Sequence, residues 1–146
     1  MTEIAFHFNV ADKLGYSCRL LRKAYLSGAQ ILVTGDPADL ALLDELLWTF
    51  APIEFVPHAM VTGEKSALLS DIPVLLTSQP AQCLHNQILV NLGLQVPDTF
   101  ERFVRLIEIV SNQDSDRLAA RRRWKHYADR GYTIQKHDLA ATADIT

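Results

Sequence analysis

Positively charged residues gather in one segment near the C-terminal end of the sequence. Seven of the 14 Lys and Arg residues lie between Arg117 and Lys136, where Asp129 is the one acidic residue. The segment therefore carries about +6 in a chain whose net charge is −3, which leaves −9 for all other residues. Segregated charge of this kind bears on binding partners rather than on fold. We expect an acidic ligand to bind this segment.

A helix through this segment would present an aromatic ring between two cations. Arg121 and Lys125 are four residues apart, and Trp124 lies beside both on a helical surface. In one interpretation Trp124 and Tyr127 anchor the helix in the core, and the arginines only solvate its outer face. In a second, Trp124 stacks on the bases of a single-stranded nucleic acid. In a third, an apolar pocket takes one bulky side chain of an acidic peptide, and the cations hold its carboxylates.

Residue groups typical of catalysis or metal binding are missing from the sequence. The five histidines, at positions 7, 58, 85, 126 and 137, have no metal-ligand spacing with another His, Cys or acid. Cys18 and Cys83 lie far apart and form no CxxC pair, so we predict buried free thiols rather than a zinc site or a disulfide. No nucleophile elbow or serine triad is recognisable.

Phosphate-binding motifs are missing as well. The turn between Asn9 and Gly15 contains one glycine and matches neither GxGxxG nor GxxxxGKS. The turn Thr34 to Pro37 places backbone donors at a predicted helix start, but Asp36 puts a carboxylate where a phosphate would bind. A nucleotide-binding α/β domain therefore stays as an alternative function, beside direct binding of single-stranded nucleic acid by the basic helix.

The elements that must position these residues alternate along the chain. Short apolar or alternating runs predict strands, and capped stripes of period 3.6 predict helices, including one that starts at Asp98 with Glu101 as its capping box. Strands are predicted at 4–10, 30–34, 55–58, 74–77, 88–91 and 132–136, and helices at 12–28, 37–50, 98–110 and 114–130. This order predicts an α/β, three-layer, Rossmann-like domain with a largely parallel central sheet and no nucleotide-binding fingerprint.

Length and composition indicate one globular domain. The chain has 146 residues, of which 49% are hydrophobic and 21% charged. We expect a single domain over residues 1–146, with a flexible tail of about the last eight residues. No apolar run approaches the ~20 residues of a membrane span, and the first residues lack the pattern of a signal peptide. We therefore expect a cytoplasmic protein that does not bind membranes.

Several short segments, taken in order, resemble one protein family. They are Leu20-Leu-Arg-Lys-Ala-Tyr25, Leu46-Leu-Trp-Thr-Phe50, Phe55-Val-Pro-His58, Pro73-Val-Leu-Leu76, Leu89-Val-Asn-Leu92, Phe100 to Val110, and Arg123-Trp-Lys-His-Tyr followed by Arg130-Gly-Tyr132. Together they resemble the chi subunit family of bacterial DNA polymerase III, over residues 4 to 139. The resemblance implies a Rossmann-like fold without catalytic activity or a cofactor.

The resemblance also implies two partners and a site for each. Chi subunits pair with the psi subunit of the clamp loader and bind the acidic C-terminal tail of single-stranded DNA-binding protein, which ends in phenylalanine. DNA would be reached only indirectly, because the acidic remainder of the chain repels it. The tail site falls on Val110, Arg121, Trp124, Lys125 and Ile134, and the psi-facing surface on Phe55, Val56, Pro57 and His58. Some members carry tyrosine at the position of Trp124, and Arg117, Arg122 and Arg123 are expected only to steer the ligand.

Overall fold

A parallel sheet organises the part of the chain that the computed structural model describes, residues 1–49, 55–61 and 71–140. Its strands are β1 (Glu3–Val10), β2 (Ile31–Thr34), β3 (His58–Met60), β4 (Val74–Leu76), β5 (Ile88–Asn91), β6 (Arg105–Ser111) and β7 (Ile134–Asp138). Their order in the sheet is β3-β4-β2-β5-β6-β1-β7, and each neighbouring pair is parallel. The prediction of a largely parallel sheet is therefore confirmed.

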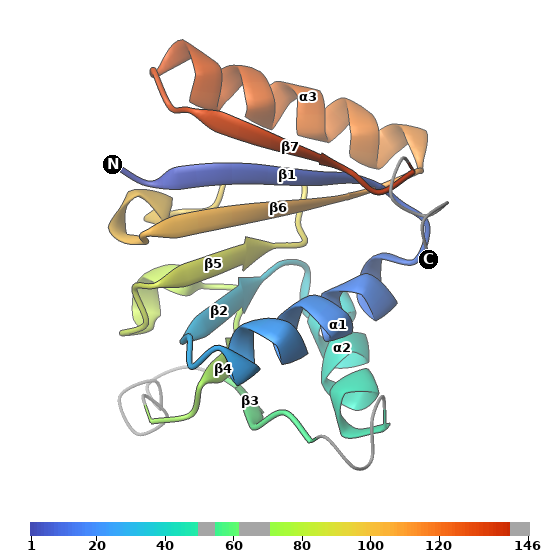
Figure 1. Ribbon diagram of the computed structural model, residues 1–146, viewed down its shortest axis with the longest axis vertical. Coiled ribbons are helices and arrows are strands. Elements are labelled where there is room, and N and C mark those ends of the chain that lie inside the picture. Colours follow the sequence, from blue (N-terminus) through green and yellow to red (C-terminus); the bar gives the residue numbers. More distant parts are fainter. Residues whose placement is uncertain (50–54, 62–70, 141–146) are drawn as a thin grey trace.

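Helices cover both faces of the sheet. The elements are α1 (Lys13–Leu26), α2 (Pro37–Thr49) and α3 (Asp114–Asp129), with short 3-10 turns η2 (Pro80–Gln82) and η3 (Phe100–Arg102). Alternation along β2 separates two cores: Ile31 and Val33 pack with α1 and α2, whereas Leu32 packs in the core that includes α3. Figure 1 shows α3 beside β7 and β1, while α1 and α2 lie beside β2 and β4. The result is the predicted three-layer α/β domain.

Two predicted helices begin with the expected caps. The Asp12 carboxylate accepts a hydrogen bond from the Gly15 amide at 3.0 Å, and Asp36 accepts one from Ala38 at 3.2 Å. Gly28, with φ of +85°, follows the end of α1 in the left-handed region. These local signals place α1 and α2 against β2, whose four residues are all buried.

The helix predicted over 98–110 is wrong, because this segment forms η3 and the inner strand β6. Thr99, with φ of +62°, turns the chain before η3, and the expected cap at Asp98 and Glu101 is not formed. β6 lies between β5 and β1, so both of its faces are buried and its apolar residues need not alternate. A short apolar run of this kind has no period that separates a strand from a helix, and Ile107 and Ile109 favour the strand.

The basic helix and the strand after it were predicted correctly, but with a different helix start. α3 begins at Asp114, and its N-cap residue Gln113 makes no capping hydrogen bond, although Asp114 or Ser115 was expected as the cap. Gly131, with φ of +82°, reverses the chain after α3. β7 then returns parallel to β1 as the edge strand, two residues later than predicted.

Two further predictions are partly addressed. The strand predicted at 55–58 starts only at His58, because β3 pairs with β4 from that residue onward. The expected flexible tail lies mostly outside the described residues, since β7 ends at Asp138 and the description ends at residue 140. In the described parts of the chain, no helix is long and apolar enough to cross a membrane.

Candidate functional site

A groove of about 450 Å³ runs between α3 and the strands at one end of the sheet. Its lining comes from four elements: Phe6, Phe8 and Asn9 from β1, Val110 from β6, Arg117, Ala120, Arg121 and Trp124 from α3, and Lys136 from β7. β1 supplies its rings at alternate positions on the face that α3 covers. The groove therefore brings together residues from both ends of the sequence.

The inner wall of the groove is apolar. The rings of Phe6 and Trp124 pack with centroids 5.0 Å apart and planes tilted by 52°. Val110 and Ala120 are buried beside them, while Trp124 keeps part of its surface open. A partly open aromatic wall over a small apolar floor can hold one bulky hydrophobic side chain of a ligand.

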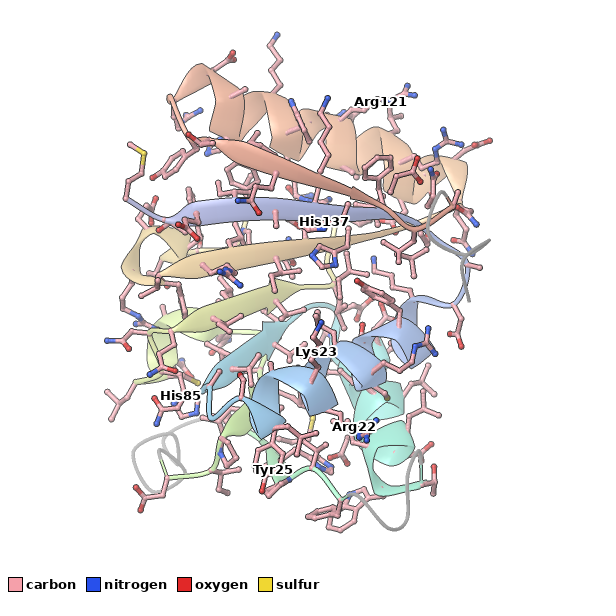
Figure 2. The ribbon with its side chains drawn as sticks, in the orientation of Figure 1. Arg22, Lys23, Tyr25, His85, Arg121 and His137 are labelled. Carbon is pink, nitrogen blue, oxygen red and sulfur yellow. The ribbon has the colours of Figure 1, made fainter. Side chains whose placement is uncertain are left out.

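The rim of the groove carries three cations. Arg117 and Arg121 are one helical turn apart on α3 and exposed, and the Lys136 ammonium lies 5.3 Å from the centre of the Trp124 ring. Among the described residues, none of these three side chains forms an ion pair or a hydrogen bond. Figure 2 shows Arg121 on α3, well away from Lys23 on α1. The rim can therefore accept carboxylates without first losing an internal partner.

The residues predicted for this site fall into two groups. Val110, Arg121 and Trp124 line the groove together. Lys125 is exposed on α3 but does not line it, and Ile134 packs into the core under α3, two residues before Lys136 on the same face of β7. The prediction missed Phe6, Phe8, Asn9, Arg117, Ala120 and Lys136. The alternation of Phe6 and Phe8 was a usable signal, but pairing of β1 with β6 and β7 could not be read from the sequence.

A buried polar network fixes α3 to the same face of the sheet that carries the groove. Glu108 of β6 is 0% exposed; it accepts hydrogen bonds from Arg123 Nε at 3.1 Å, Tyr127 Oη at 2.5 Å and Asn91 Nδ2 at 2.8 Å. Arg123 is 2% exposed and also donates to the Leu94 carbonyl at 3.0 Å. The expectation that Arg123 only steers a ligand is therefore wrong, because its guanidinium is part of the core.

Burial governs the protonation behaviour of this network. It raises the pKa of Glu108, and the charge of Arg123 and the hydrogen bonds from Tyr127 and Asn91 oppose that rise. Burial and the neighbouring Glu108 also raise the pKa of Tyr127, which therefore stays a neutral donor. The network sets the rotation of α3 on the sheet and so decides which of its arginines reach the groove.

The segment predicted to face psi lies at the far end of the sheet, against α2. Phe55 stacks on Trp48 with ring centroids 4.9 Å apart, and these side chains are 44% and 59% exposed. Leu42 and Leu46 are exposed on the same helix, where they line a shallow depression with Trp48. Open aromatic and aliphatic side chains clustered in this way are typical of protein interfaces.

His58 and Val56 hold this aromatic pair in place and are themselves buried. The His58 ring donates a hydrogen bond from Nδ1 to the Val56 carbonyl oxygen at 2.7 Å, and its Nε2 lies 3.2 Å from Asp44 Oδ1 on α2. Pro57 between them is half-buried. Of the four residues predicted to face psi, Phe55 is thus the one with an open side chain, and its neighbours orient it.

A larger crevice of about 1040 Å³ lies at the carboxyl ends of the strands, where α/β sheets commonly bind ligands. The carboxylates of Asp12 and Asp36 already bond the amides that begin α1 and α2 there. A phosphate would meet these acids and Asp39 instead of free donors. The geometry gives the nucleotide-binding alternative no support.

The remaining candidates for chemistry are structural in the described residues. Cys18 and Cys83 are free and buried, as predicted. Burial raises the pKa of Cys18 to about 11 and also raises that of Cys83, so neither thiol is activated. No group of three His, Cys, Asp or Glu side chains is placed to hold a metal ion in the parts of the chain that are described.

Comparison with known proteins identifies the family. A model of the DNA polymerase III chi subunit family, HolC, matches residues 1–135 of the sequence. The chain belongs to the DNA polymerase III chi subunit family. This chi-family chain is 32% identical to the DNA polymerase III subunit chi of Pseudomonas aeruginosa over 144 residues, which cover 95% of the chain and 98% of the relative. It is 27% identical to the Haemophilus influenzae subunit, over 84% of the chain and 85% of the relative.

Family membership gives the chain an accessory role in DNA replication as a chi-type subunit of DNA polymerase III. Solved structures share its fold at low sequence identity. The C-terminal domain of Saccharomyces cerevisiae Dbp5 superposes with a TM-score of 0.60 at 12% identity, over 94% of this chain and 90% of that domain. This likeness concerns the fold alone.

Proposed function

We propose that this chi-family chain is a non-catalytic connector between the psi subunit of the clamp loader and single-stranded DNA-binding protein. The groove beneath α3 takes the acidic C-terminal tail of the latter, which ends in phenylalanine. The observation that carries this proposal is the combination of an apolar wall with three cations at its rim that pair with no carboxylate among the described residues. The terminal ring fits the wall, and the carboxylates of the tail fit the rim.

The psi subunit binds the opposite end of the sheet in this proposal. The Trp48 and Phe55 pair supports it, because two large aromatic side chains remain open where α2 meets the Phe55 to His58 segment. The two surfaces lie at different ends of the strand order, near β7 and near β3. One chain can therefore hold both partners at once.

Replacement of Arg121 tests the tail site. We expect Arg121→Ala to weaken binding of a fluorescent acidic peptide ending in phenylalanine by about 10-fold or more, because a charge-assisted hydrogen bond is lost. Arg122→Ala is the matched control: its side chain is exposed on the same helix but does not line the groove. Equal affinity of both variants, or tighter binding of a single-stranded oligonucleotide than of the peptide, would contradict the assignment.

Replacement of Phe55 tests the psi site independently. Phe55→Ala should reduce co-purification with psi and leave the affinity for the acidic peptide unchanged, since the two surfaces share no residue. Thermal melts of the variant serve as a control for folding. Loss of both interactions together would show that Phe55 acts through the fold and not through a psi interface.

A further inference from the structure

Lys136 is the cation that β7 contributes to the groove. In the sheet Lys136 pairs in register with Phe6, and the alternation along β7 puts it on the face that α3 covers. It is thus the one cation of the groove rim that comes from the sheet, whereas Arg117 and Arg121 come from the helix.

Contacts at the end of β7 hold this strand in place beside the groove. Asn9 Nδ2 donates to Asp138 Oδ1 at 2.8 Å, and this bond ties the last residue of β7 to β1. Asn9 itself has φ of +59° and lies where the pairing of β1 with β6 shifts register. The edge strand is therefore fixed to β1 next to Lys136, although no strand within the described part of the chain pairs with its other side.

The charge of Lys136 is available to a ligand. Its ammonium lies over the Trp124 ring, and such a cation–π contact leaves the positive charge uncompensated. Among the described residues no carboxylate pairs with Lys136. A ligand ring that packs against Trp124 would consequently lie directly beside this ammonium.

The two sides of the rim suit different carboxylates. The terminal carboxylate and the terminal ring belong to one residue, so their separation varies within narrow limits, and the planar forks of Arg117 and Arg121 suit such a restricted geometry. Side-chain carboxylates of the preceding acidic residues vary in position, and a flexible ammonium accommodates this variation better. Among the described residues β7 is the edge of the sheet, so the tail can run out of the groove across this strand.

We propose that Lys136 determines specificity for acidic residues in the bound tail: it pairs with a side-chain carboxylate from the β7 side, while Arg117 and Arg121 hold the terminal carboxylate. This inference rests on the proposed function of the groove. It adds the direction of the peptide, with the terminal ring against Phe6 and Trp124 and the acidic residues crossing β7.

Peptide binding by the full chain tests this proposal. Two fluorescent nonapeptides end in phenylalanine with a free carboxylate, one with three Asp residues before the last three positions and one with Asn in their place. We expect Lys136→Met, which keeps an unbranched side chain of similar length without the charge, to weaken binding of the Asp peptide about fivefold and to leave binding of the Asn peptide unchanged. Lys23→Met removes the same charge from α1 and should change neither (Figure 2).

Each other outcome overturns the proposal. Equal loss for both peptides would assign Lys136 to the terminal carboxylate or to the fold, and no loss for either would remove it from the site. A third peptide has the Asp sequence with a C-terminal amide. If Lys136→Met weakened binding of the free-carboxylate Asp peptide but not of this amide, Lys136 would be assigned to the terminal carboxylate instead. If the unaltered chain binds neither peptide, the proposed function itself fails, so the two failures are distinguishable.

Discussion

The two sides of α3 use the same kind of residue for opposite purposes. Arg121 is exposed and lines an open groove, whereas Arg123, two residues later, is buried against Glu108 and the Leu94 carbonyl. Trp124 and Tyr127 differ in the same way, because the first keeps open surface and the second is fully buried. The number of positive charges in a helix therefore does not show how many of them can bind a ligand. The rotation of the helix on its sheet decides which of these side chains are exposed.

The buried side of α3 gives the largest predicted effect. Arg123→Met should lower the free energy of unfolding by about 3–5 kcal/mol, because it leaves the Glu108 carboxylate buried without a compensating charge. Urea unfolding followed by circular dichroism measures this loss. In the double variant Glu108→Leu with Arg123→Met we expect much of the stability to return. A single variant as stable as the unaltered chain would contradict the role assigned to the network.

The open side of α3 should show the reverse pattern. Trp124→Ala should weaken binding of the acidic peptide by about 2 kcal/mol, or roughly 30-fold, since it removes the aromatic wall of the groove. Its effect on unfolding should be smaller, at about 1–2 kcal/mol, because the ring is only half-buried. Trp48→Ala, at the other tryptophan of the chain, is the matched control and should leave peptide affinity intact. Parallel losses in both variants would place the binding surface elsewhere.

Acid should destabilise the fold through His7, which lies on the face of β1 that is turned away from α3. Burial, and then the charges of His137 and Arg105, lower the pKa of His7 to about 4 from its ordinary value of 6.5. As the pH falls, the unfolded chain therefore binds a proton at His7 before the folded chain does. Stability that is present above pH 6.5 is consequently lost as the pH falls toward 4. The raised pKa of Glu108 has the opposite sign, so the network under α3 does not cause this loss.

Unfolding midpoints in urea at about pH 7 and about pH 4.5 measure this smallest effect. His7→Gln should show a shallower decline between the two than the unaltered chain, because it removes the group that takes up the proton. His137→Asn is a useful comparison, because the ring centroid of His137 lies 4.5 Å from that of His7. An identical decline in the unaltered chain and His7→Gln would locate the acid sensitivity in other groups.

Local signals in the sequence were enough for much of the fold. Caps at Asp12 and Asp36, the apolar run of β2 and the glycine after α3 each act within a few residues, so they were readable without the structure. β6 was not readable in this way. It is buried on both faces by elements distant in sequence, and that burial, rather than any local period, makes it a strand.

The site was predictable where it lies on one helix and not where it depends on pairing. Arg121 and Trp124 follow from helical spacing, but Lys136 joins them only because β7 pairs with β1. The sequence did contain one signal for Arg123 that was not used. Glu108 stands alone in an apolar run, and a buried acid needs a partner, which the arginine one turn before Tyr127 supplies.

The place of β1 between β6 and β7 also bears on how the chain is made. During synthesis the first strand leaves the ribosome long before either of its neighbours exists, because both are encoded near the end of the sequence. Phe6 and Phe8 therefore stay exposed, or bound by a chaperone, until β6 and β7 have been synthesised and can pair with β1. The groove is complete only after Lys136 has emerged, so a nascent chain cannot bind a ligand there before β7 has been made.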